Sequence, residues 1–313
     1  MTTIDRLLLR RVIAFANDKG GVFKTSLVAA IGALLAQGGH RILLIDLDPQ
    51  ANLGEDLGYT GDPRANSDAL AQALLDGDPI EVLQGVRTNL DVIPGGSRTY
   101  EIQRALIAED IPRDALASTL QDLAPRYDVI LIDTPPKSPE LVDLALAAAR
   151  YMIIPARSDS SSRKGLSTMA AQYGQAQEVN PTLELLGICL TGIGQQSTRL
   201  RARAFDAMNA DFDGQAPLFE TTIRYVESAA HDVREYGRPP HELEQIADEA
   251  EPWYMRLRKK VAGEGDKSVS NEPVIAASAG SLAQDYQLLT REVLTRLVEA
   301  EQQLAAQAGE GTR

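Results

Sequence analysis

Two lysines and a threonine lie close together in the segment NDKGGVFKTS, which covers residues 17–26. Lys24 and Thr25 follow a pair of glycines and precede the run SLVAAIGALLAQ, which predicts a helix. Backbone N–H groups at a helix N-terminus bind phosphate oxygens, a lysine adds positive charge, and a Ser or Thr hydroxyl can hold Mg²⁺. These residue types at this spacing therefore indicate phosphate binding.

The general phosphate-loop pattern, G-x-x-x-x-G-K-[ST], is not met at either glycine position, because Asp18 and Phe23 stand there. At a position normally held by glycine, a strained residue of another type costs on the order of 1–3 kcal/mol. This cost corresponds to a loss of about one to two decades in nucleotide affinity. Since Lys24 and Thr25 remain, we expect binding to survive, with the Phe23 side chain directed away from the phosphates.

Carboxylates follow two further apolar runs. Asp48 ends the segment RILLIDLD, and Asp133 ends DVILID. Taken alone, Asp48 is typical of a cap or turn residue before Pro49, whereas Asp133, at the end of a buried run, indicates a metal contact or a cap.

The elements that position these residues follow from short apolar runs. Six of them predict strands, at Val12–Ala16, Arg41–Ile45, Leu90–Ile93, Asp128–Ile132, Tyr151–Ile154 and Leu185–Leu190. Helical stretches such as Ser26–Gln37 and Ser138–Ala149 lie between them. Runs without polar alternation indicate strands buried on both faces, so the expected fold is α/β, a mostly parallel twisted sheet flanked by helices.

Length and composition are those of a globular protein, and we interpret residues 1–313 as a single domain. A polar stretch at 240–275 predicts an insertion, and apolar residues spaced by three and four predict a C-terminal helix at about 280–300. A single cysteine excludes a disulfide framework and a cysteine-based metal cage. Cys189 lies in an apolar run and is expected to be a buried structural thiol.

Charge and hydropathy indicate the compartment. The N-terminal stretch MTTIDRLLLRR is too short and too charged for a signal peptide, and no apolar run approaches the roughly 20 residues of a membrane span. We expect a cytoplasmic protein with no membrane partner. The net charge of −13 argues against a generally basic surface, so any nucleic-acid contact requires a local patch.

Three motifs carry a resemblance to a known family: KGGVFKT at 19–25, LLIDLDPQANL at 43–53 and YDVILIDTPP at 127–136. In this order they resemble the deviant Walker-type ATPases and, among these, the ParA family of DNA-partitioning ATPases. The resemblance runs from about Val12 to Gly237 and resumes at 282–297. It implies the P-loop NTPase fold of the deviant Walker A type, with ATP and Mg²⁺ as cofactors.

The resemblance also implies roles within the loop. The nucleotide-binding residues would be Lys19, Gly20, Gly21, Val22, Phe23, Lys24, Thr25 and Ser26. Lys24 would contact the β- and γ-phosphates. Lys19 would be the signature lysine, which crosses the dimer interface to the phosphates of the partner subunit.

Further roles carry over to the other two motifs. Asp48 would orient the attacking water and, with Lys19 and Lys24, complete the catalytic set. Thr25, Asp48 and Asp133 would organise the metal, Asp133 through water. Residues 134–136 would sense the γ-phosphate.

The activity implied is that of an ATP-dependent DNA partition, or segregation, ATPase. ATP would drive formation of a homodimer, which would bind double-stranded DNA without sequence preference and be released on hydrolysis. Turnover to ADP and phosphate would be slow and stimulated by a ParB-like centromere-binding protein. In its ATP-bound form the protein would associate with the nucleoid.

Candidate DNA-contacting residues lie in the C-terminal half, at Arg199, Arg203 and Arg224. Arg199 and Arg203 are one helical turn apart and can share a face. A second basic cluster, WYMRLRKK at 253–260, lies in the predicted insertion.

Two alternatives remain open. A non-catalytic or weakly hydrolysing ParA-like localisation protein is favoured by Phe23. A MinD-like membrane-positioning ATPase would need a basic amphipathic C-terminal helix, whereas this helix carries Glu292, Glu299 and Glu301 beside its two arginines.

Overall fold

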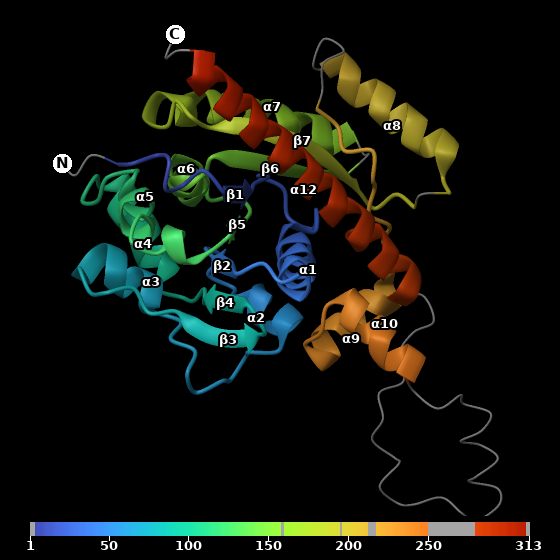
Figure 1. Cartoon of the computed structure of the whole chain (residues 1–313), viewed down its shortest axis with the longest axis horizontal. Coiled ribbons are helices and arrows are strands. Elements are labelled where there is room, and N and C mark those ends of the chain that lie inside the picture. The colour runs from blue at the N-terminus through green and yellow to red at the C-terminus, as the bar shows by residue number, and fades with distance from the viewer. Residues whose placement is uncertain (1–3, 158–159, 195, 212–216, 250–278, 311–313) are drawn as a thin grey trace, which may run out of the picture.

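The computed structural model describes residues 4–157, 160–194, 196–211, 217–249 and 279–310 (Figure 1). A seven-stranded sheet runs through the molecule in the order β3-β4-β2-β5-β1-β6-β7. The strands are β1 (Val12–Phe15), β2 (Ile42–Asp46), β3 (Leu83–Arg87), β4 (Leu90–Ile93), β5 (Val129–Asp133), β6 (Tyr151–Arg157) and β7 (Glu184–Thr191). All neighbouring strands are parallel except β3 and β4. The expected α/β fold with a mostly parallel sheet is confirmed.

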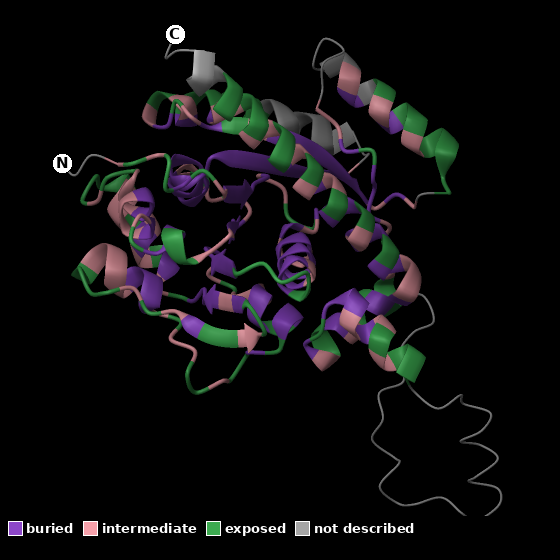
Figure 2. Cartoon of the chain, in the orientation of Figure 1, coloured by how far each residue is buried: buried purple, intermediate pink, exposed green. Residues whose placement is uncertain are grey.

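Helices cover both faces of this sheet (Figures 1 and 2). They are α1 (Lys24–Gln37), α2 (Asn52–Leu57), α3 (Ala69–Ala71), α4 (Thr99–Ile107), α5 (Ala115–Leu120), α6 (Pro139–Ala148), α7 (Ser160–Val179), α8 (Thr198–Asp211), α9 (Glu227–Tyr236), α10 (Pro240–Glu249) and α12 (Ala279–Glu310). A π-helical turn, η1 (Gln72–Asp76), and a 3₁₀ turn, η2 (Ala124–Arg126), complete the set within the described ranges.

Strand residues divide between two apolar layers because successive side chains point to opposite faces. In β1, Val12 and Ala14 pack with α5, α6 and α7, whereas Ile13 and Phe15 pack with α1, α2 and α12. The central strands are buried throughout. This double burial explains why their sequences are continuous apolar runs.

The carboxyl ends of β2, β5 and β1 meet at one edge, because these strands are parallel neighbours. Asp46 and Asp133 are register partners at the ends of β2 and β5. The loops that follow β1, β2 and β5 therefore converge, and they contain the three sequence motifs.

Three features differ from the sequence-based expectation or extend it. Strand β3 was not predicted, because its residues LQGVR are half-exposed at an antiparallel edge and form no apolar run. Helix α12 spans 32 residues and is longer than predicted. The first part of the predicted insertion is helix α10. Leu243 of this helix is buried, and the helix packs against α12. The remainder of that insertion, with the basic cluster at 253–260, lies outside the described residues.

Two smaller observations complete the fold. Cys189 is buried in β7, and burial raises the pKa of its thiol, as expected of a structural cysteine. Within the described ranges, no helix has both the length and the apolar character to cross a bilayer.

Candidate functional site

The loop between β1 and α1 is fixed at its start by Asn17. The buried Asn17 amide donates to the Pro155 carbonyl at 2.7 Å and accepts the Lys19 N–H at 2.9 Å. The Lys137 N–H, from the loop after β5, donates to the Asp18 carbonyl at 3.1 Å. The loop is therefore tied to its neighbours on both sides.

Phe23 adopts the left-handed conformation that glycine normally provides. Its φ and ψ are 70° and 26°, and it caps the N-terminus of α1, with the Leu27 N–H donating to its carbonyl at 2.9 Å. This conformation costs a residue with a Cβ roughly 1–2 kcal/mol. The half-buried ring stacks on Tyr225, with centroids 5.9 Å apart and planes at 17°. The chain thus keeps the backbone geometry of a glycine without having one.

Lys24 is buried beneath its own loop. Its Nζ donates to the carbonyls of Asn17 at 3.0 Å and of Lys19 at 3.1 Å. Burial lowers the pKa of Lys24, and the carboxylates of Asp133 and Asp48 oppose this shift. Lys19 is half-buried in the same loop. Both lysines thus belong to the loop between β1 and α1, and Lys24 lies near the carboxylates of Asp133 and Asp48.

Asp133 is fully buried at the end of β5, and neither of its carboxylate oxygens has a hydrogen-bond partner among the described residues. Burial raises the pKa of Asp133 to about 7, against the opposing influence of the nearby Thr25 hydroxyl and Lys24 ammonium. An unpaired buried carboxylate calls for a partner. Beside the Thr25 hydroxyl, such a carboxylate fits a Mg²⁺ ion.

Asp46 and Asp48 lie beside it on the β2 side. The Asp48 N–H donates to Oδ1 of Asp46 at 2.8 Å, and Oδ1 of Asp48 accepts the Gln50 N–H at 2.9 Å. Burial, and then the charge of Asp133, raises the pKa of Asp46. Asp48 is mostly buried and holds a turn. Sequence reasoning assigned no role to Asp46, although its place in the segment DLD was a usable signal.

The described residues contain no group of three or more His, Cys, Asp or Glu side chains that could hold a metal by themselves. Mg²⁺ in phosphate-transfer sites keeps several waters and takes one or two protein ligands plus substrate phosphates. Asp133 would supply a carboxylate for such a site, and the Thr25 hydroxyl lies near it.

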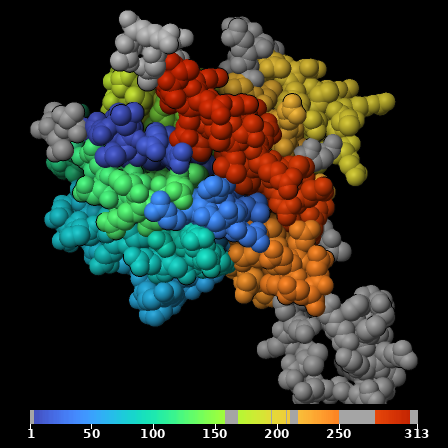
Figure 3. All heavy atoms as spheres, viewed as in Figure 1, coloured from blue at the N-terminus to red at the C-terminus, as the bar shows by residue number. Residues whose placement is uncertain are grey.

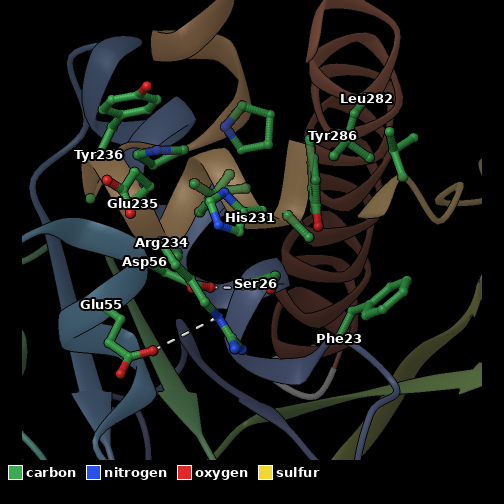
Figure 4. A pocket seen from close by; sticks show the side chains of 18 of the residues that line it. Phe23, Ser26, Glu55, Asp56, His231, Arg234, Glu235, Tyr236, Leu282 and Tyr286 are labelled. Atoms are coloured by element: carbon green, nitrogen blue, oxygen red, sulfur yellow. Dashed lines mark hydrogen bonds and ion pairs between the residues drawn. The ribbon is translucent and has the colours of Figure 1, made fainter. Parts of the chain in front are cut away.

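A cavity of about 910 Å³ adjoins the loop (Figure 4). Its walls come from α1, α2, α9 and α12, and Gly21, Phe23 and Ser26 line its end at the loop. Figure 3 shows α12 as a continuous band across this side of the molecule, next to α1, with α9 and α10 at one end. The volume is within the ~300–1,000 Å³ typical of small-molecule sites.

A polar cluster lies in the cavity wall. Ser26 Oγ donates to Asp56 Oδ2 at 3.1 Å, and Arg234 Nε lies 3.6 Å from Asp56 Oδ1 and 3.8 Å from Glu55 Oε2 (Figure 4). Burial raises the pKa of Asp56 to about 6, and the Arg234 charge opposes that rise. No sequence motif indicated Asp56, because its partners come from α1 and α9.

The structure separates the three candidate DNA-contacting arginines by their surroundings. Arg199 and Arg203 are exposed on α8. Arg224 instead makes a bidentate pair with Asp285 of α12, at 2.7 and 2.9 Å, and the Asp285 side chain is almost fully buried. The charge of Arg224 is thus already matched within the chain.

Comparisons with known sequences indicate the family. A sequence-family model described as an AAA domain matches residues 10–185, more than half of the chain. The chain is 37% identical over 256 residues to a ParA family protein of Chlamydia pneumoniae, covering 80% of this chain and 97% of that protein. It is 35% identical over 184 residues to the chromosome partitioning protein ParA of Myxococcus xanthus, covering 58% of this chain and 64% of that relative.

Solved structures show the same architecture. Cobyrinic acid a,c-diamide synthase from Mycobacterium smegmatis, with bound ADP and magnesium, has a TM-score of 0.60 at 30% identity, covering 72% of this chain and 92% of its own. A Cyanothece McdA variant in complex with ATP has a TM-score of 0.65 at 23% identity, covering 82% and 97%. The Pyrococcus furiosus cell division ATPase MinD has a TM-score of 0.60 at 19% identity, covering 90% and 98%. The last two likenesses show the fold alone.

The family model, the Chlamydia relative and the three motifs at one edge of the sheet all indicate the same family. The chain belongs to the ParA family of ATPases.

Proposed function

We propose that this protein is a cytoplasmic partition ATPase that dimerises on ATP, binds double-stranded DNA without sequence preference and is released by slow hydrolysis. The observation that carries the proposal is the convergence of three loops at the carboxyl edge of the sheet. They bring Lys24, Asp48 and Asp133 together, and the cavity of about 910 Å³ begins at Gly21, Phe23 and Ser26 next to Lys24 in the chain. The printed names of the relatives, which include a chromosome partitioning protein ParA, support it.

The loop residues would bind the phosphates. Ser26, in the first turn of α1, lines the cavity next to the loop. Phosphate oxygens would replace the Asn17 and Lys19 carbonyls as partners of the Lys24 ammonium. Lys19 would act on the phosphates of the second subunit. Asp48 would accept a hydrogen bond from the attacking water and so orient it.

Thr25 and Asp133, with Asp48 close by, would hold Mg²⁺, as the neighbour solved with ADP and magnesium supports. The ion supplies positive charge on the phosphate oxygens. The protein's own contribution would be the Thr25 hydroxyl and the Asp133 carboxylate, which lie close to each other. The Asp133 carboxylate, which is buried and has no hydrogen-bond partner among the described residues, supports that role.

DNA contact would be confined to a local patch because the net charge is −13. Arg199 and Arg203, exposed on one face of α8, would form its centre. Arg224 contributes less, since Asp285 already binds its guanidinium. Release would be stimulated by a ParB-like partner.

A ParA-like localisation protein with weak or no turnover is the second candidate, and the strained Phe23 backbone favours it. Membrane positioning is not favoured. The apolar face of α12 is buried against the sheet through Tyr286, Leu289 and Val293, so it is not available to lipid.

Retention on immobilised non-specific duplex DNA tests the proposal, with ATP, with ADP and without nucleotide, at two salt concentrations. We expect retention only with ATP, weakening as salt rises. It should be lost in Lys24→Ala and reduced in Arg199→Ala/Arg203→Ala. Equal retention under all nucleotide conditions, or none, would contradict the proposed cycle.

A further inference from the structure

The stacked pair of Phe23 and Tyr225 joins the phosphate loop to a distant part of the chain. Phe23 carries the left-handed backbone at the start of α1, and Tyr225 precedes α9. Both rings line the cavity, and Tyr225 is 53% exposed. The Tyr225 ring therefore contributes little to the core, and its stacking on Phe23 is the contact that needs an explanation.

The backbone on which Tyr225 stands is firmly held. Ile223 is fully buried and pairs with the end of β7, through N–H groups of Gly192 and Ile193 that donate to its carbonyl at 2.7 and 3.1 Å. The next residue, Arg224, is fixed to Asp285 of α12 by its backbone N–H at 3.0 Å and by its guanidinium. Tyr225 is therefore presented from a rigid support.

The loop, by contrast, needs a restraint at residue 23. Glycine adopts a positive φ freely, whereas phenylalanine has a strong preference against it. If Phe23 relaxed to a negative φ, the first N–H groups of α1 would turn away from the position of the phosphates. The stack is a side-chain contact from outside the loop that opposes this change, in addition to the packing of Phe23 against the apolar cluster that includes α1 and α12.

We propose that Tyr225 is a positioning residue for the phosphate loop: by stacking on Phe23 it holds the left-handed backbone that other loops obtain from glycine. The inference rests on the proposed function, in that it assigns the restraint to an ATP-binding loop. It predicts that Tyr225 matters for nucleotide affinity only while residue 23 is phenylalanine.

A double-mutant cycle tests this dependence, with MgATP and MgADP titrated into each protein by calorimetry. Tyr225→Ala should weaken both nucleotides by about three- to tenfold, and Tyr225→Phe should restore affinity because the stack is retained. Phe23→Gly should bind at least as tightly as the wild type. In the Phe23→Gly background, Tyr225→Ala should change affinity by less than about twofold.

Two controls make the outcome specific. Tyr100→Ala removes a similarly exposed tyrosine on α4, 49% exposed, and should leave both affinities unchanged. Thermal unfolding without nucleotide checks that each variant folds. An equal loss from Tyr225→Ala in both backgrounds would overturn the inference, because Tyr225 would then touch the nucleotide itself. No loss in the wild-type background would also overturn it.

The Lys24→Ala variant distinguishes a failure of the proposed nucleotide site from a failure of the role proposed for Tyr225. A wild type that binds no nucleotide, or a Lys24→Ala variant that binds as well as the wild type, would overturn the nucleotide site and this inference with it. When the wild type binds and Lys24→Ala does not, the cycle alone decides the role of Tyr225.

Discussion

Asp56 is a carboxyl group in the cavity wall whose charge depends on its surroundings. It is buried, its Oδ2 accepts a hydrogen bond from Ser26, and Arg234 lies close to it. Burial raises the pKa of Asp56 to about 6 from an ordinary value of 3.8. The folded protein therefore binds a proton at this carboxyl more tightly than the unfolded chain does.

A sign follows for the pH dependence of stability. A carboxyl with a raised folded pKa contributes stability that is present below pH 4 and is lost as pH rises to about 6. The Asp56→Asn variant has no carboxyl group at this position, so its stability does not fall with rising pH for this reason. Its free energy of unfolding relative to the wild type should increase by on the order of 2 kcal/mol between pH 4 and pH 7. Urea unfolding of the nucleotide-free proteins at several pH values measures this difference, and parallel pH profiles would contradict the assignment.

Helix α12 makes contacts with three separate parts of the chain: the segment before α9, strand β7 and the residue before β1. Asp285 near its start binds Arg224, Arg296 donates to the Leu186 carbonyl at 3.0 Å, and Glu301 near its end pairs with Arg11. Its apolar face packs on the sheet between these contacts. The helix therefore fixes the segment before α9 relative to β7.

Removing Arg224 should loosen this attachment. Arg224→Ala leaves the buried Asp285 carboxylate without its cation, which should lower the free energy of unfolding by about 3 kcal/mol. Arg199→Ala, an exposed arginine on α8, is the matched control and should change stability by less than about 0.5 kcal/mol. Denaturant unfolding of the two variants makes the comparison. A stable Arg224→Ala that loses DNA retention alone would contradict the structural role given to Arg224.

Among the secondary-structure elements, six of the seven strands were predicted from the sequence to within a few residues, because strands buried on both faces are continuous apolar runs. Strand β3 gave no such signal, since it is half-exposed at the edge. The motifs located Lys24 and Asp133, because both stand beside predicted element ends. The contacts of Asp56 and Tyr225 were not predictable, since they depend on how α9 and α12 pack against α1.

At the scale of the whole molecule, the candidate phosphate site and the candidate DNA-contacting arginines of α8 lie on different elements. The carboxyl edge of the sheet gathers the phosphate loop and the carboxylates, and the exposed arginines of α8 lie on a helix at the periphery (Figure 1). Helix α8 lies between β7 and α9 in the chain, and α9 with residues 224–226 just before it forms part of the cavity wall. A nucleotide in this cavity would contact elements that lead to both regions.

The central claim is that the loop with Phe23 is a working phosphate site. Calorimetric titration of MgATP into the wild type and into Lys24→Ala tests it most directly. The account predicts saturable binding to the wild type and a loss of affinity of at least about tenfold in Lys24→Ala, since the variant loses a charged partner of the phosphates. Equal binding by the two proteins, or none by the wild type, would contradict it.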